Sequence, residues 1–267
     1  MENEVYQLFA EIQATHWWFI ARRLILEDIL KRSLTSPTPR RLADIGCGTG
    51  AMLPTLSQFG EVWGIDNSPE AVALCHHQKL SNVYLDEDPA WRQVQFDVMT
   101  FFDVIEHIEN ETAFLKNYLD QLKPNGLVFI TVPAFMFLWT EHDVLNHHCR
   151  RYTASRLRQL LQRVDLVPLK LSYFNTWLFP VIAAARVFTR MKRFVEGKVK
   201  SNGQITMRTD FERNLPLLNG ILRFIFASER FVLRRGSFPF GTSLLSIAKK
   251  PDVESLFTPE SRFVLQP

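Results

Sequence analysis

The chain has 267 residues, 46% of them hydrophobic, and carries 31 Lys and Arg against 28 Asp and Glu. This length and apolar content suffice for one large domain with a full core and exclude a disordered chain. The net charge of +3 is too small to indicate a nucleic-acid partner, and no recognition motif for DNA or RNA is present, so none is expected.

The cysteines and the N-terminus favour a cytoplasmic protein. Cys47, Cys75 and Cys149 have neither the spacing of a disulfide framework nor that of a zinc ribbon. Glu2 and Glu4 stand where a secretory signal would carry basic residues, so no such signal is expected. No run of about 18 uncharged apolar residues predicts a membrane-spanning helix.

The first half of the chain alternates strands with helices. Residues 5–33 predict a helix, which a Pro-rich breaker at 36–39 ends. Strands are then predicted at 41–45, 61–66, 82–85, 96–104 and 127–132, helices at 69–79 and 111–122, and a turn at 123–126. Apolar strands separated by helices indicate an α/β fold whose parallel sheet is covered on both faces.

The pattern changes after the fifth strand. A polar, His-rich segment leads to a helix at 153–164, which Thr153 can cap, and the last two strands are predicted at 166–174 and 243–248. A long insert separates these strands, and a connection of that length is usually functional or structured. The predicted parts are an N-terminal helical cap (1–39), a core (40–175), a hydrophobic and basic helical insert (176–241), and the last strand with a tail (242–267).

The strongest local signal is the glycine-rich stretch at 44–50, which reads Asp-Ile-Gly-Cys-Gly-Thr-Gly between a strand and a helix. Gly46 and Gly48 allow a tight turn that leaves room for a ligand at the carboxyl end of the strand. Asp66 ends the next strand, 22 residues after Asp44, where a carboxylate can accept hydrogen bonds from both ribose hydroxyls. The alternative is an ordinary tight turn in which Asp66 caps the following helix.

The spacing of this turn discriminates between nucleoside ligands. It departs from the Gly-x-Gly-x-x-Gly pattern of dinucleotide sites, and position 51 is Ala. An acid directly before the first glycine suits an ammonium-bearing ligand better than a pyrophosphate. The stretch therefore favours S-adenosylmethionine (SAM) over NAD.

Four motifs in order, at 44–50, 64–66, 96–108 and 122–127, resemble those of class I SAM-dependent methyltransferases. The resemblance covers about residues 40–135, and the flanking segments 16–23 and 141–152 are similar to a bacterial subgroup of the methyltransferase 11/12-like type. It implies a Rossmann-like, seven-stranded, mostly parallel sheet with helices on both faces, an N-terminal helical extension and a helical insert before the last strand.

The resemblance also implies SAM as cofactor and a set of residues around it. Asp44 and Gly46 would hold the methionine end, Asp66 the ribose, and Asp86 or Asp88 the adenine amino group. Glu106 would lie in the turn after the fourth strand, near the site. The predicted donor-binding residues are Asp44, Gly46, Cys47, Gly48, Gly50, Asp66, Asn67, Asp86, Phe102, Asp103 and His107.

Methyl transfer to a hydroxyl usually needs a base as well as alignment of donor and acceptor. The candidate bases are His107, His142, Asp143, His147 and His148, and for each histidine the alternative is a structural hydrogen bond. Of these, His142, His147, Asp143 and His107 are predicted to be catalytic. The run of His, Asp and Cys at 142–149 matches no structural zinc spacing, so no metal is expected.

Three further segments have more than one interpretation. Arg150 and Arg151 could clamp an anionic substrate or form a solvated charge pair. The aromatic residues at 17–19 could cover the donor or pack the N-terminal helix onto the sheet. Apolar and basic residues of the insert suit core packing, peripheral contact with an anionic membrane, a cover for a greasy acceptor, or a homodimer face.

These observations favour a SAM-dependent methyltransferase acting on a small-molecule, glycan or lipid-linked acceptor, in the cytoplasm and with membrane association left open. Two other classes stay open at this point. An NAD-dependent oxidoreductase would use the same sheet edge, and a non-catalytic SAM-binding regulatory protein would share the donor motifs.

Overall fold

The computed structural model describes residues 10–36, 40–196 and 216–252, without the side chains of residues 190–196 and 216. The start of the predicted N-terminal helix, the middle of the insert and the C-terminal tail lie outside the described residues.

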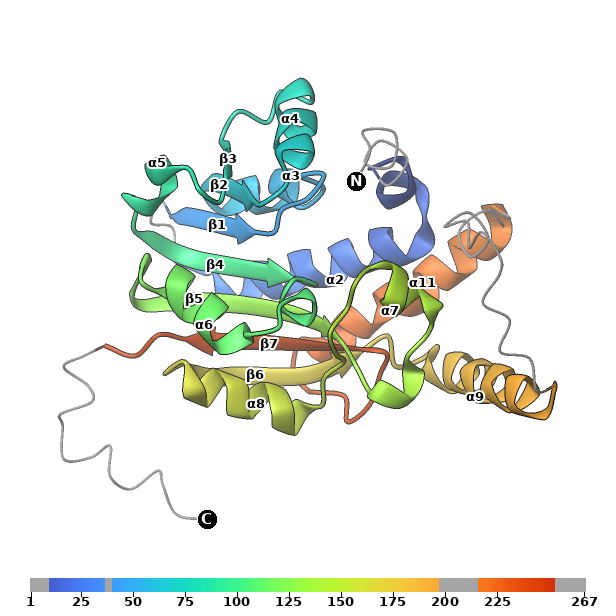
Figure 1. Cartoon of the computed structure of the whole chain (residues 1–267). Coiled ribbons are helices and arrows are strands. Elements are labelled where there is room, and N and C mark those ends of the chain that lie inside the picture. The colour runs from blue at the N-terminus through green and yellow to red at the C-terminus, as the bar shows by residue number, and fades with distance from the viewer. Residues whose placement is uncertain (1–9, 37–39, 197–215, 253–267) are drawn as a thin grey trace, which may run out of the picture.

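A seven-stranded sheet forms the centre of the molecule, in the order β3-β2-β1-β4-β5-β7-β6 (Figure 1). The strands are β1 (Arg41–Ile45), β2 (Glu61–Asp66), β3 (Val83–Leu85), β4 (Phe96–Phe102), β5 (Leu122–Pro133), β6 (Val167–Phe174) and β7 (Ser243–Lys249). Only β7 runs antiparallel to its neighbours in this sheet, β5 and β6. The predicted mostly parallel, Rossmann-like sheet is therefore confirmed.

Helices cover both faces of this sheet (Figure 1). They are α2 (Trp17–Ser33), α3 (Leu53–Leu56), α4 (Pro69–His77), α5 (Pro89–Arg92), α6 (Glu111–Leu119), α7 (Glu141–Leu145), α8 (Ala154–Arg163), α9 (Phe179–Glu196) and α11 (Pro216–Leu233), with 3-10 turns η1 (Ser57–Phe59), η2 (Ile105–His107) and η3 (Met136–Leu138). The central strands β1, β4 and β5 are buried on both sides, as their near-continuous apolar sequences predict.

The predicted N-terminal helix is interrupted at His16. Residues 10–15 are helical, but His16 is extended, and its Nδ1 accepts the backbone N–H of Trp18 at 3.3 Å. This bond gives α2 its N-cap, so the chain forms two helices where one is predicted.

The turn predicted at 123–126 is also wrong, because these residues belong to β5. The cause is a distant partner. Lys250 accepts the N–H of Asn125 at 2.9 Å and donates its own N–H to Gly126, while its ammonium group donates to the carbonyl of Leu122 at 2.8 Å. The segment after β7 therefore holds these turn-forming residues in the sheet.

The helix α2 and the insert pack against each other. Trp17 donates its backbone N–H to the side chain of Asn219 at 2.9 Å, and its ring meets that of Phe226 edge-on. At the other end Arg234 pairs with Asp28 at 2.7 Å. Trp17 therefore packs α2 against α11 of the insert, a partner other than the sheet that the packing interpretation names.

The insert occupies the chain between β6 and β7, where α11 has one buried and one exposed face. Phe226, Ala227 and Leu233 are buried against the body of the protein. The residues on the opposite side are apolar and exposed, namely Leu217, Ile221, Phe224 and Phe231. Within the described residues, no helix combines the length and apolar character that crossing a membrane requires.

Candidate active site

The functional residues converge at the carboxyl ends of the parallel strands, where open α/β sheets bind ligands. The chain leaves β1 through the glycine-rich turn, and Gly46 donates its N–H to the carbonyl of Ile65 at 2.7 Å. Gly46 has φ of +70°, and a Cβ there would lie 2.6 Å from a methyl group of Val104. Gly48 has φ of +53° with open space at its Cβ position, so the turn leaves room for a ligand to approach the backbone.

Asp66 ends β2 beside this turn. Its Oδ2 accepts the N–H of Gly48 at 2.8 Å, and its Oδ1 accepts the N–H of Ser68 at 2.9 Å. A carboxylate offers about four acceptor positions, so two remain for ribose hydroxyls. The predicted ligand role and the alternative as a capping residue are compatible in this geometry.

Asp44 is a buried acid at the end of β1, 3% exposed. It accepts a hydrogen bond from the Thr100 hydroxyl, and Arg22 and Asp66 are its charged neighbours. Burial raises the pKa of Asp44 to about 7, because desolvation outweighs the Thr100 hydrogen bond and the positive charge of Arg22. A ligand ammonium group placed here would favour the ionised carboxylate.

The affinity for S-adenosylhomocysteine (SAH) is therefore expected to increase with pH. An acid with a pKa of about 7 is mostly uncharged at pH 6 and charged at pH 8. A ligand that requires the carboxylate binds about tenfold more weakly at pH 6 than at pH 8. Calorimetric titrations across this range test the expectation, with Asp44→Asn as the control that should remove the dependence on pH. An equally steep dependence in this variant would assign the effect to another group.

Arg22 lies beside the predicted donor site, although no sequence motif assigns it a role there. It reaches from α2 to the ends of β4 and β5, is 7% exposed, and pairs with Asp103 at 2.8 Å. It also donates to the Thr131 hydroxyl at 2.6 Å, and its guanidinium lies over the rings of Trp18 and Phe102. Phe102 and Asp103, both predicted to border the methionine group, are thus joined by a residue from the N-terminal helix.

The other residues predicted to bind the methyl donor lie farther from the glycine-rich turn or contact other parts of the protein. Asp86 accepts the Tyr118 hydroxyl at 2.6 Å and stays about one-third exposed after β3, which leaves it able to meet a ligand. Asp88 caps α5 instead. Asn67 is exposed at the end of β2. The Cys47 side chain is buried in a small apolar cluster with Leu53 and Cys75, so its role in donor binding stays a prediction.

The predicted catalytic residues of the His-rich segment have different environments. Asp143 is fully buried, and its oxygens accept hydrogen bonds from Arg151, His148 and Thr140. These partners hold its pKa well below the usual range. Asp143 has no place as a general base, and the prediction is corrected to a positioning role.

The catalytic roles of the two other histidines of this segment stay predictions. His142 is half-buried on α7, and its Nε2 lies 2.8 Å from the side-chain nitrogen of Asn146. His147 is exposed and has φ of +55°, a conformation that directs the chain out of α7.

The Arg150–Arg151 pair is engaged inside the protein. Arg150 pairs with Glu111, and Arg151 forms a two-pronged bond with Asp143 at 2.8 and 2.9 Å. Neither guanidinium is available as a substrate clamp, so that interpretation is wrong, and so is the alternative of a solvated pair.

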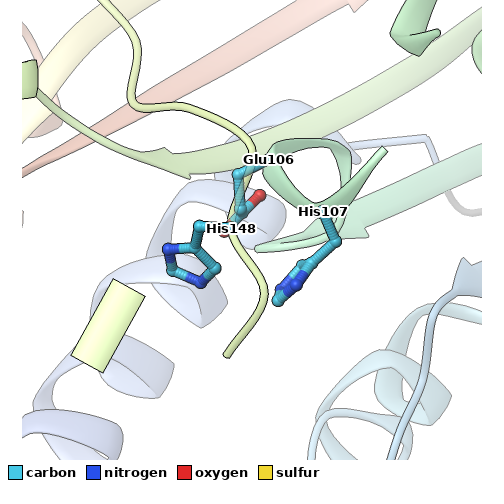
Figure 2. A group of neighbouring side chains, drawn as sticks. All are labelled: Glu106, His107 and His148. Atoms are coloured by element: carbon cyan, nitrogen blue, oxygen red, sulfur yellow. The ribbon is translucent and has the colours of Figure 1, made fainter. Parts of the chain in front are cut away.

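His107 lies on η2, close to Glu106 and to His148 (Figure 2). Its pKa is lowered, first by burial and then by the neighbouring His148. A histidine held neutral can accept a proton or bind a cation.

The strand order, the glycine-rich turn and the acids at the ends of β1 and β2 are those of a Rossmann-like SAM-dependent methyltransferase fold. The chain belongs to the family described as "Methyltransferase domain", whose profile matches residues 17–171. The domain that the chain carries is therefore a methyltransferase domain of the SAM-dependent kind, with SAM rather than NAD as its cofactor.

Curated relatives include two proteins named ubiquinone biosynthesis O-methyltransferase. The one from Bradyrhizobium diazoefficiens is 34% identical over 110 residues, which cover 38% of this chain and 42% of the relative. The one from Xanthomonas axonopodis pv. citri is 33% identical over 104 residues, covering 36% and 44%. The chain therefore matches less than half the length of these relatives.

Solved structures share the fold. A SAM-dependent methyltransferase from Archaeoglobus fulgidus aligns with a TM-score of 0.51 at 17% identity, covering 85% of this chain and 94% of that one. The plantazolicin methyltransferase in complex with SAH aligns with a TM-score of 0.53 at 15% identity, covering 93% and 90%.

Proposed function

We propose that this protein transfers the methyl group of SAM to a hydroxyl oxygen of a small, lipophilic acceptor. The assignment of SAM as methyl donor rests on the placement of Asp44 and Asp66 on either side of the glycine turn. Asp44 is buried, and Asp66 has acceptor positions left for a ligand. SAM presents an ammonium group on its methionine and two hydroxyls on its ribose, and each of these suits an acid.

Two observations support the acceptor half. The relatives with 33–34% identity are named O-methyltransferases, which favours oxygen over nitrogen as the acceptor atom. The exposed apolar face of α11 suits contact with a lipophilic acceptor, or with a membrane that contains such an acceptor.

The first test is calorimetric titration with SAH, with NAD as the control ligand. Micromolar binding of SAH alone is the expected result, and binding of NAD instead would overturn the donor assignment. Transfer of labelled methyl from SAM is then measured to a phenol with an apolar tail and to the same phenol without it. Preference for the tailed phenol is expected, and transfer only to amines would overturn the acceptor assignment.

A further inference from the structure

Three side chains from two distant segments meet beside the predicted methyl-transfer site. Glu106 and His107 come from η2 after β4, and His148 comes from the chain that follows α7. One carboxylate oxygen and one ring nitrogen from each histidine all lie within 4.8 Å of one another (Figure 2). Two imidazoles and one carboxylate are a recurrent donor set for transition metals in proteins.

Glu106 has no partner that accounts for its burial. The residue is fully buried, and neither of its carboxylate oxygens has a hydrogen-bond partner among the described residues. The nearby cations Arg22 and Arg151 are already paired, with Asp103 and Asp143 respectively. A buried acid of this kind carries a large desolvation cost unless a proton, a water or a cation satisfies it.

His148 is oriented as metal-binding histidines are. Its Nδ1 lies 2.8 Å from Oδ1 of Asp143, so the carboxylate fixes the ring and leaves Nε2 for another ligand. Asp143 is itself held by the two-pronged bond from Arg151. Such a carboxylate–histidine pair sets the tautomer and raises the basicity of the ligating nitrogen.

The two segments are fixed to each other by their backbones. Cys149, next to His148, donates its N–H to the carbonyl of Glu106 at 2.6 Å, and its thiol donates to the carbonyl of His107 at 3.4 Å. These bonds hold His148 close to η2. The ring of His107 lies edge-on to that of His148, with their centroids 4.6 Å apart, so the three ligand groups are already close together.

We propose that Glu106, His107 and His148 bind one divalent transition-metal ion, with Zn²⁺ as the ion of matching chemistry. Imidazole nitrogens favour zinc, cobalt or iron over Mg²⁺, which prefers oxygen ligands. The spacing of the His-rich segment alone cannot show this site, because two of the three ligands come from η2, about 40 residues earlier in the chain.

The metal ion would activate the acceptor hydroxyl, a role that rests on the proposed function. Three protein ligands leave a coordination position open for the acceptor hydroxyl. A bound cation lowers the pKa of that hydroxyl, and its proton passes to water. The oxygen then forms a bond to the methyl carbon as the carbon–sulfur bond breaks, and the electron pair stays on sulfur to give SAH.

The test measures metal binding directly on untagged, chelator-treated full-length protein. Zn²⁺ is titrated calorimetrically, Co²⁺ is titrated with its visible absorption as readout, and Mg²⁺ serves as the control ion. The wild-type protein is expected to bind one Zn²⁺ with micromolar or tighter affinity. Glu106→Gln, which keeps the side-chain shape, and His148→Ala are each expected to weaken binding by about 100-fold.

His77→Ala provides the matched control, because this exposed histidine on α4 lies outside the cluster and its loss should leave Zn²⁺ affinity unchanged. Thermal unfolding and SAH affinity establish that each variant is folded. Absence of stoichiometric Zn²⁺ binding in the wild type, or equal affinity in Glu106→Gln and His148→Ala, would overturn the site. Zn²⁺ binding without SAH binding would instead uphold the site and overturn the proposed function.

Discussion

Replacing Asp66 with Ala is expected to weaken SAH binding by at least about 100-fold. The carboxylate would accept two ribose hydroxyls, and a hydrogen bond to a charged group is worth about 1.5–3 kcal/mol. The loss is therefore at least about 3 kcal/mol. The variant also loses the bond that holds the N–H of Gly48, which loosens the turn that faces the ligand. Calorimetric titration of wild type and variant measures the difference.

Glu61→Ala is the matched control for this experiment. Glu61 is an exposed carboxylate at the opposite end of the same strand, so its loss should change SAH affinity by less than about twofold. Thermal unfolding shows whether Asp66→Ala keeps its fold. A folded Asp66→Ala protein with unchanged affinity would remove Asp66 from the donor site and leave it as a capping residue only.

The sheet is predictable from sequence because each of its strands carries its own signal. The β1 and β4 segments are short apolar runs bounded by polar or glycine-rich residues, and their structural bounds agree with the prediction within two residues. One error, the helix break at His16, has a local cause in the cap on Trp18, and another arises where a distant partner overrides the local pattern. Residues 123–126 are typical of a turn, but Lys250 pairs them into the sheet, and no local window contains that residue.

Some residues of the candidate site are likewise predictable from the sequence, and others are not. The glycine turn and Asp66 lie within one strand–turn–helix–strand unit, so their spacing is visible in the sequence. Arg22 is invisible there, because its contacts with Asp103 and Thr131 depend on how α2 docks across the sheet. The same holds for the meeting of Glu106 with His148. Tertiary packing brings such side chains together, and the spacing of residues in the sequence does not predict these contacts.

A buried acid on α11 links the insert to the end of β6. Glu229 on α11 is fully buried and accepts the backbone N–H groups of Asn175, Thr176 and Trp177 at 2.6 to 2.8 Å. These three residues form the exit from β6 toward α9. Burial raises the pKa of Glu229 to about 7, because desolvation outweighs the hydrogen bonds from these three donors.

Glu229→Ala is expected to destabilise the protein by about 3 kcal/mol or more, because each buried N–H left without a partner costs about 1–3 kcal/mol. The melting temperature should fall by about 6–12 °C for a chain of this size. Glu229→Gln should fall in between, since its amide oxygen can keep the bonds to Thr176 and Trp177 while its NH₂ group faces the N–H of Asn175. Ser228→Ala, one position earlier on α11, is the control and should shift stability by no more than about 0.5 kcal/mol. Equal melting temperatures for Glu229→Ala and Ser228→Ala would show that the bonds from Glu229 add nothing measurable to the other contacts of α11, such as the Arg234–Asp28 pair.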